Sequence, residues 1–189
     1  MGAKKLPSLY QIKVTLVGAK PPIWRRLLVH GNIKLDTFHD VIQYSMGWMN
    51  GHLHQFEKDG VLYGVPDGEF DFGFDLEDEN KYRLSDLLKS EKDWLSYEYD
   101  FGDDWRHKII LEKILPFDAS SGVAKCIKGK RACPPEDCGG IWGYENLLEI
   151  MSDPAHDEHE DMMEWLGEEF DPERFSLSEI NTMLSKHIK

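Results

Sequence analysis

The chain has 189 residues, of which 41% are hydrophobic. It can therefore bury one substantial core, and we expect a single domain over residues 1–189. Its 35 acidic residues outnumber 22 Lys and Arg residues, and the net charge of −13 disfavours nucleic acid as a partner. No apolar run approaches the ~20 residues that cross a bilayer, and residues 1–7 lack the apolar core of a signal peptide. We therefore expect a cytoplasmic protein with no membrane partner.

Two strands are expected at the start of the chain. Residues 10–17 alternate between apolar and polar side chains, which is the pattern of a half-buried strand. Pro21 and Pro22 interrupt this pattern, and residues 23–30 resume it. The short connection predicts that the two strands pair as a hairpin.

A helix is expected over residues 37–46, because its apolar residues recur at helical spacing. Thr37 and Asp40 have the spacing of a capping box, and Gly47 is a suitable helix end. Four further elements are expected before residue 90, namely strands over residues 52–57 and 61–63, an acidic loop over residues 64–80 and a short helix over residues 85–89.

The most regular pattern lies in residues 94–115, where two alternating runs flank residues 102–104 and predict a hairpin with a three-residue turn. The predicted pairs are Phe101 with Trp105, Tyr99 with His107, Tyr97 with Ile109, Leu95 with Leu111, Asp100 with Arg106 and Glu98 with Lys108. Each favourable pair contributes roughly 0.2–1 kcal/mol. His107 falls on the apolar face of this hairpin, and we expect it to be a core residue rather than a ligand.

Regular patterning is lost after Pro116 and returns near Tyr144. This connection is longer than an ordinary loop, so we expect it to be functional or packed irregularly against the sheet. Three helices are expected after it, over residues 144–151, over residues 157–166 and from residue 177 onward. Ser176 and Glu179 form a capping box for the last one. Because strands come early and helices late, the sequence predicts an α+β domain with a mainly antiparallel sheet and a helical C-terminal third.

The first candidate site is the pair of histidines His52 and His54. Alternate residues of a strand lie on one face roughly 6–7 Å apart, so both imidazoles could reach one divalent metal ion. His39, His107 or an aspartate of residues 100–104 could supply a third ligand. The alternative is that one histidine packs in the core and the other is solvated.

The three cysteines form a second candidate site. An odd number argues against a closed set of disulfides and agrees with reduced thiols. Their spacing lacks the C-x2-C element of common zinc sites, so a histidine would have to complete the coordination. The candidate metal ligands are His52, His54, Cys133 and Cys138. The alternatives are buried, unreactive thiols packing an irregular loop, or one reactive cysteine beside Lys130 and Arg131.

Residues 133–140 combine two prolines, two acids and two glycines, so this loop should have a defined shape. We expect residues 126–144 to lie beside His52 and His54 and to bury Trp142 against the hairpin. The candidate residues of the resulting polar pocket are His52, His54, Asp103, Asp104, Glu136 and Asp137. A purely structural loop, whose acids cap backbone amides, is the alternative.

Basic residues gather in two segments. Residues 1–35 hold seven Lys or Arg and no acid, and residues 119–135 hold four and no acid. Such a patch can bind phosphate even in an acidic protein. The candidate anion patch consists of Arg25, Arg26, Lys128, Lys130 and Arg131. The alternative is that basic and acidic regions neutralise one another across the fold.

Several strings of the sequence are characteristic of one family. They are YQIKVTL (10–16), PPIWRR (21–26), HLHQF (52–56), YDFGDDWRH (99–107), ACPPEDCGGIWGY (132–144) and EWLG (164–167). On these strings the chain resembles the plasmid pRiA ORF-three-like family over nearly its whole length. The labels of its members, as plasmid, resolvase-like or mobile-element proteins, imply no reaction and no catalytic residues.

We therefore expect a binding or accessory module linked to mobile elements, with a function that the family has not defined. One alternative is a metal-assisted hydrolase that uses His52, His54, Asp103 and Glu136 with a divalent metal as cofactor. The other is a nucleic-acid-associated protein that uses the basic N-terminal patch.

Overall fold

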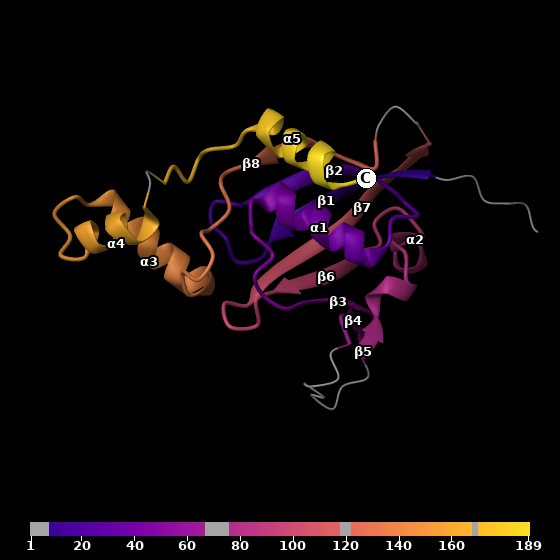
Figure 1. Ribbon diagram of the computed structural model, residues 1–189, viewed down its shortest axis with the longest axis horizontal. Coiled ribbons are helices and arrows are strands. Elements are labelled where there is room, and N and C mark those ends of the chain that lie inside the picture. Colours follow the sequence, from indigo (N-terminus) through magenta and orange to yellow (C-terminus); the bar gives the residue numbers. More distant parts are fainter. Residues whose placement is uncertain (1–7, 67–75, 118–121, 168–169) are drawn as a thin grey trace, which may run out of the picture.

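A single large sheet dominates the computed structural model, which describes residues 8–66, 76–117, 122–167 and 170–189 (Figure 1). The strands are β1 (Ser8–Leu16), β2 (Trp24–His30), β3 (His54–Lys58), β4 (Val61–Gly64), β5 (Leu76–Asp78), β6 (Trp94–Tyr99), β7 (Trp105–Pro116) and β8 (Ala124–Lys130). Their order across the sheet is β5-β4-β3-β6-β7-β1-β2-β8. Neighbouring strands are antiparallel except β4 and β5, which are parallel.

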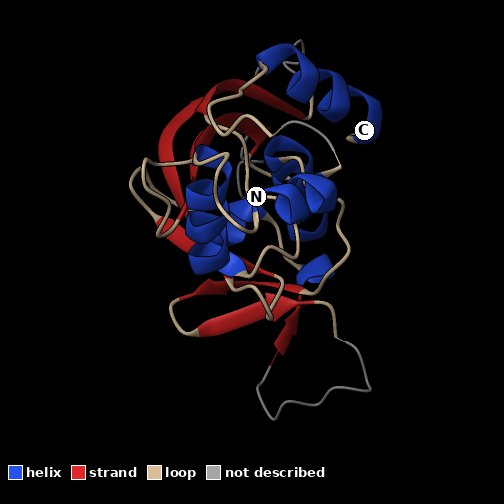
Figure 2. Cartoon of the chain, turned by 90° about the vertical axis from the view of Figure 1, so that its left-hand side faces the viewer, coloured by secondary structure: helices blue, strands red, loops and turns tan. Residues whose placement is uncertain are grey.

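The helices are α1 (Leu35–Met46), α2 (Leu84–Leu87), α3 (Gly140–Ser152), α4 (His159–Leu166) and α5 (Leu177–His187), and a 3-10 turn spans Glu79–Lys81. Helix α5 lies beside α1 and against β8, whereas α3 and α4 project to one side of the strands (Figure 1). In the side view the strands bend around the helices (Figure 2). No helix in the described ranges is both long and apolar enough to span a bilayer.

The core lies between the sheet and α1. Tyr10, Ile12 and Val14 share one face of β1 and are buried, because alternate residues of a strand point to the same side. Phe38 and Val41 on α1 are fully buried in the same cluster. The expected hairpin of the first two strands is confirmed, since β1 and β2 pair antiparallel.

The expected α+β domain with a helical C-terminal third is wrong. The molecule is mostly sheet, its helices are scattered along the chain, and the last helix is short. Strand β8 continues to Lys130, and α3, α4 and α5 are three separate helices. The sequence of β8, A-K-C-I-K-G-K, lacks clear alternation, so its strand character comes from pairing with β2 and packing of α5.

Two of the predicted helix caps are confirmed and one is wrong. Gly47 ends α1 in the left-handed conformation, and Ser176 accepts a hydrogen bond from the Glu179 amide at the start of α5, as expected. The capping box of Thr37 and Asp40 is wrong, because α1 begins at Leu35. The Leu35 amide donates to the Tyr82 carbonyl at 3.2 Å, so pairing with a distant segment fixes this helix start.

The register of the β6–β7 hairpin differs from the prediction by two residues. Tyr99 pairs with Trp105 rather than with His107, and Tyr97 pairs with His107. The turn is longer than expected, because the Asp104 amide donates to the Asp100 carbonyl at 2.7 Å and closes the loop there. A shift of two residues keeps the side chains of β6 and β7 on their predicted faces, whereas Asp100 and Phe101 lie in the turn and their predicted pairs with Arg106 and Trp105 do not form. His107 is accordingly fully buried, as predicted.

Of the expected acidic loop over residues 64–80, residues 67–75 lie outside the described ranges. The remainder contains β5, which the sequence did not predict.

Candidate metal centre

Three loops meet at one end of the sheet: residues 47–53 after α1, residues 100–104 between β6 and β7, and residues 131–139 before α3. The Trp48 indole donates to the Pro134 carbonyl at 3.0 Å, which ties the first loop to the third. Of the segment 126–144 that was expected beside His52 and His54, the third loop lies next to His52, whereas residues 126–130 belong to β8 at an edge of the sheet away from β3. Trp142 does not bury its indole there, because it lies on α3 and is 83% exposed.

Glu136 holds the same loops together with both of its carboxylate oxygens. Oε1 accepts a hydrogen bond from the Tyr99 hydroxyl at 2.5 Å, and Oε2 accepts one from the Met49 amide at 3.1 Å. The Gly51 amide donates to the same tyrosine oxygen at 2.9 Å. Burial and the Glu136 carboxylate raise the pKa of Tyr99 strongly, so its hydroxyl keeps its proton.

The second and third loops approach each other closely. The Gly139 amide donates to Asp103 Oδ2 at 3.2 Å. A Cβ added to Gly140, which has φ +67°, would lie 2.3 Å from the Asp103 carbonyl oxygen, so only glycine fits at this contact.

His52 lies between two aspartates that come from different loops. Its Nδ1 is 3.7 Å from Asp100 Oδ2, and its Nε2 is 3.2 Å from Asp137 Oδ1. One ligand atom from each of the three residues lies within 4.8 Å of the others, and no further trio of His, Cys, Asp or Glu in the described ranges does so. The His52 side chain is 33% exposed, so a solvated ion can reach it.

The turn orients the Asp100 carboxylate. Asp100 Oδ1 accepts hydrogen bonds from the Gly102 amide at 2.9 Å and the Asp103 amide at 3.4 Å, which leaves Oδ2 towards His52. Asp100 and Asp137 both have positive φ, at 57° and 60°. Aspartate tolerates this conformation better than most residues, and strained backbone often marks functional sites.

This trio offers one imidazole nitrogen and two carboxylate oxygens. Zn²⁺ and Mn²⁺ accept such mixed ligands at about 2.0–2.2 Å from each atom. The two carboxylates now face different nitrogens of the His52 ring, so side-chain rotations would have to bring the three ligand atoms closer around one ion. Three protein ligands leave coordination positions open to water or to a further ligand.

His54 belongs to a different environment. Its Nε2 lies 2.9 Å from Glu79 Oε2, and its ring stacks on His39 with centroids 3.4 Å apart. His39 in turn contacts the Tyr97 hydroxyl at 2.8 Å and Asn50 Oδ1 at 2.7 Å. Burial, helped by neighbouring His54, lowers the pKa of His39 to about 3, so this imidazole is neutral. We call these five residues the interior network.

The structure therefore separates the two histidines of the predicted chelate. Strand β3 begins at His54, and His52 precedes it in a bend, so the alternate-residue geometry of a strand does not apply between them. The remaining pocket candidate, Asp104, binds Arg106 Nε at 2.6 Å rather than facing His52.

The predicted cysteine ligands do not join His52. Burial raises the pKa of the Cys138 thiol to about 12 and raises that of Cys133 as well, so neither is favoured as a thiolate. Cys126 is buried under the β2–β8 pairing, with Sγ 3.6 Å from the Lys128 carbonyl. Cys126 therefore matches the alternative of a buried thiol, whereas Cys133 and Cys138 are half-buried.

The predicted anion patch is split by burial and pairing. Arg25 is buried and donates from Nε to the Ser45 carbonyl at 2.7 Å. Arg131 is buried and bonds to Glu173 at 3.0 Å, and Arg26 forms a two-pronged contact with Glu112 at 2.6 and 2.8 Å. Of the five candidates, Lys128 and Lys130 alone are exposed.

Comparisons with known proteins identify the family to which this fold belongs. The family profile of the plasmid pRiA4b ORF-3-like protein matches residues 8–179. The chain belongs to the plasmid pRiA4b ORF-3-like family. The uncharacterized protein y4hQ of Sinorhizobium fredii is 36% identical over 175 residues, which cover 92% of this chain and 89% of that protein. The crystal structure of MM3350 from Methanosarcina mazei Go1, a protein of unknown function, has a TM-score of 0.82 at 40% identity and covers 94% of this chain and 98% of that one.

The family resemblance inferred from the sequence strings is thus confirmed. In this member of the pRiA4b ORF-3-like family, the structure also shows how the site residues are arranged, which the sequence did not predict in full. Asp100 was expected only as one of several aspartates in residues 100–104. Its signal is the D-x-G spacing with Gly102, which is typical of an aspartate that accepts from the backbone of its own turn. Glu79 carried no local signal, because its partner His54 is distant in sequence.

Proposed function

We propose that the protein is a single-domain binding module for a divalent cation, held by His52, Asp100 and Asp137. The observation that supports this most is the convergence of one imidazole and two carboxylates from three separate loops around a half-exposed point. Hydrogen bonds of the turn hold the Asp100 carboxylate in place before any ion arrives, and the Gly139–Asp103 contact fixes the backbone of the loop that carries Asp137. Such preorganisation reduces the cost of binding.

The surroundings favour binding over hydrolysis. A metal-assisted hydrolase needs a free base beside the metal-bound water. Glu136 is the acid next to Asp137, but both of its oxygens already accept hydrogen bonds from other loops. Asp103 is likewise used by the Gly139 amide.

Hydrolysis is the second candidate function, since three protein ligands leave coordination positions open, as in catalytic zinc sites. Phosphate or nucleic-acid binding is not proposed, because two of the five basic candidates are buried and a third is paired with Glu112.

The test is a calorimetric titration with Mn²⁺ and Zn²⁺ of protein purified without a metal-affinity step and treated with chelator. We expect one ion per chain and at least ~10-fold weaker binding in Asp137→Asn, which removes a charged ligand. Asp104→Asn is a matched control, because Asp104 also has positive φ but faces Arg106, and it should leave affinity unchanged.

Two results would contradict the cation site: no saturable binding up to millimolar ion, or equal effects of the two Asp→Asn variants. Incubating the Mn²⁺-loaded protein with p-nitrophenyl phosphate and p-nitrophenyl acetate then separates the two functions. Turnover that disappears in Asp137→Asn would favour the hydrolase.

A further inference from the structure

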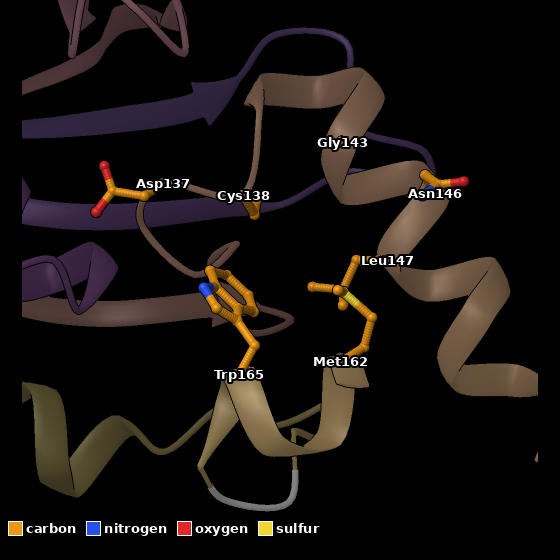
Figure 3. A pocket seen from close by; sticks show the side chains of 7 residues that line it. All are labelled: Asp137, Cys138, Gly143, Asn146, Leu147, Met162 and Trp165. Carbon is orange, nitrogen blue, oxygen red and sulfur yellow. The ribbon is translucent and has the colours of Figure 1, made fainter. Parts of the chain in front are cut away.

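An open groove of about 250 Å³ lies between α3, α4 and the loop that precedes α3 (Figure 3). Its lining residues are Asp137, Cys138, Gly143, Asn146, Leu147, Met162 and Trp165. Close packing builds one wall, since a Cβ on Gly143 would lie 1.8 Å from the Cys138 carbonyl oxygen. The Trp165 indole extends from α4 towards Cys138 and forms the opposite side (Figure 3).

Helix α4 leaves part of its apolar surface exposed, although Met162 and Leu166 pack against the core. None of its residues is buried, although four of its eight are Met, Trp or Leu. Trp165 is 46% exposed and Met163 is 42% exposed. Large apolar side chains in a patch rimmed by polar residues are typical of protein interaction sites, where tryptophan often contributes most of the binding energy.

The segment of the chain that forms this groove carries charged residues of one sign. Residues 132–167 contain ten Asp or Glu residues and no Lys or Arg. On α4 itself Glu160, Asp161 and Glu164 are exposed beside the apolar residues. An acidic surface of this kind attracts basic partners and repels both nucleic acid and acidic ones.

We propose that this groove docks a segment of a partner protein that carries leucine-like apolar anchors flanked by Lys or Arg. The anchors would occupy the space between Leu147, Met162 and Trp165, and the basic residues would face the acids of α4. Charge complementarity selects this occupant over a phosphate-bearing one. A second copy of the chain carries the same net charge of −13, so it would be repelled on average by this acidic groove, and a head-to-tail contact would produce open chains rather than a closed dimer.

The probe is a fluorescein-labelled peptide of about twelve residues that alternates lysine pairs with leucine pairs. One control peptide replaces the lysines with glutamates, and another replaces the leucines with serines. Fluorescence anisotropy should show saturable micromolar binding of the first peptide and at least ~10-fold weaker binding of both controls. The titration is repeated with EDTA, because the groove is expected to bind without a cation.

Two variants assign the binding to the groove. Trp165→Ala should weaken the lysine–leucine peptide at least ~10-fold. Glu160→Lys/Glu164→Lys should do the same by reversing charge. A control with equal charge change, Glu77→Lys/Glu91→Lys, alters exposed acids elsewhere and should not weaken binding.

Several results would overturn the proposal. Equal binding of the serine control would show charge attraction alone, and equal binding of the glutamate control would show apolar adhesion alone. An unchanged affinity in Glu160→Lys/Glu164→Lys would place the peptide elsewhere. Sedimentation of the protein alone as higher assemblies that Trp165→Ala disperses would identify a second copy as the occupant.

Discussion

Two histidines separated by a single residue occupy opposite kinds of environment. His52 is 33% exposed and faces two carboxylates from other loops, whereas the side chain of His54 is 8% exposed and contacts the nearly inaccessible Glu79. A metal ion can exchange with water at the first and would have to displace packed side chains at the second. The H-x-H motif therefore does not form one metal site, because β3 begins at its second histidine and the two side chains do not share the geometry of a strand.

The largest effect is expected from breaking the interior network. Glu79→Ala leaves the buried His54 ring nitrogen without its partner, and removing one member of such a pair costs about 3 kcal/mol of unfolding free energy. Urea denaturation measures this loss. The His52–Asp137 contact provides the comparison, since Asp137→Ala should cost far less. Equal losses in the two variants would refute the distinction.

For metal affinity, in contrast to stability, substitutions at His52 should have a larger effect than substitutions in the interior network. His52→Ala removes the nitrogen ligand, and we expect Mn²⁺ or Zn²⁺ affinity to fall about 100-fold, or ~2.7 kcal/mol. His54→Gln, which keeps a polar side chain, should leave affinity within about threefold. Isothermal titration of both variants decides this, and a larger loss in His54→Gln would favour the original two-histidine chelate.

Acid should destabilise the interior rather than the surface. Burial lowers the pKa of His39 to about 3 and that of His107 to about 4, whereas both titrate near 6.5 in an unfolded chain. Below pH 6.5 the unfolded state therefore binds protons that the folded state does not. Stability should fall by up to ~1.4 kcal/mol per pH unit for each histidine as the pH decreases from 6.5 to 5.

Unfolding free energies at pH 7.5, 6.5, 5.5 and 5.0 measure this slope. His39→Gln removes one of the two groups, and its slope between pH 6.5 and 5 should be smaller. A slope that stays the same in His39→Gln would mean that other groups cause the acid sensitivity.

The smallest effect concerns the stability of the half-exposed site. His52→Ala removes ion pairs that are open to water, and such pairs contribute about 0–1 kcal/mol. We therefore expect a change within about 0.5 kcal/mol in unfolding free energy without added metal. A loss as large as that of Glu79→Ala would show that His52 is a structural residue.

Local pattern predicted the faces of the strands better than their pairing. In the β6–β7 hairpin the buried side of both strands follows from alternation alone, which a shift of two residues leaves intact. The register depends on the turn, where Asp100 takes a left-handed conformation and closes a longer loop. Sequence spacing carries little information on that choice.

The candidate site was predicted in part. His52 and Asp137 were both expected in a pocket, and the docking of residues 131–139 beside His52 was anticipated from the need to satisfy a long irregular segment. The burial of Arg25 and Arg131 and the pairing of His54 with Glu79 depend on contacts between distant segments. Composition and periodicity do not encode such contacts.

Strand β8 ends the sheet in the described part of the chain, and it carries exposed Lys125, Lys128 and Lys130. Helix α5 covers part of this edge, because the Asn181 side chain accepts a hydrogen bond from the Cys126 amide and donates one to the Cys126 carbonyl. Where an edge strand is uncovered, its free amide and carbonyl groups can pair with a strand of another molecule. An added strand would have to crowd against these three ammonium groups, so it is disfavoured. The positive charge that suggests phosphate binding in the sequence thereby protects the folded chain against edge-to-edge aggregation.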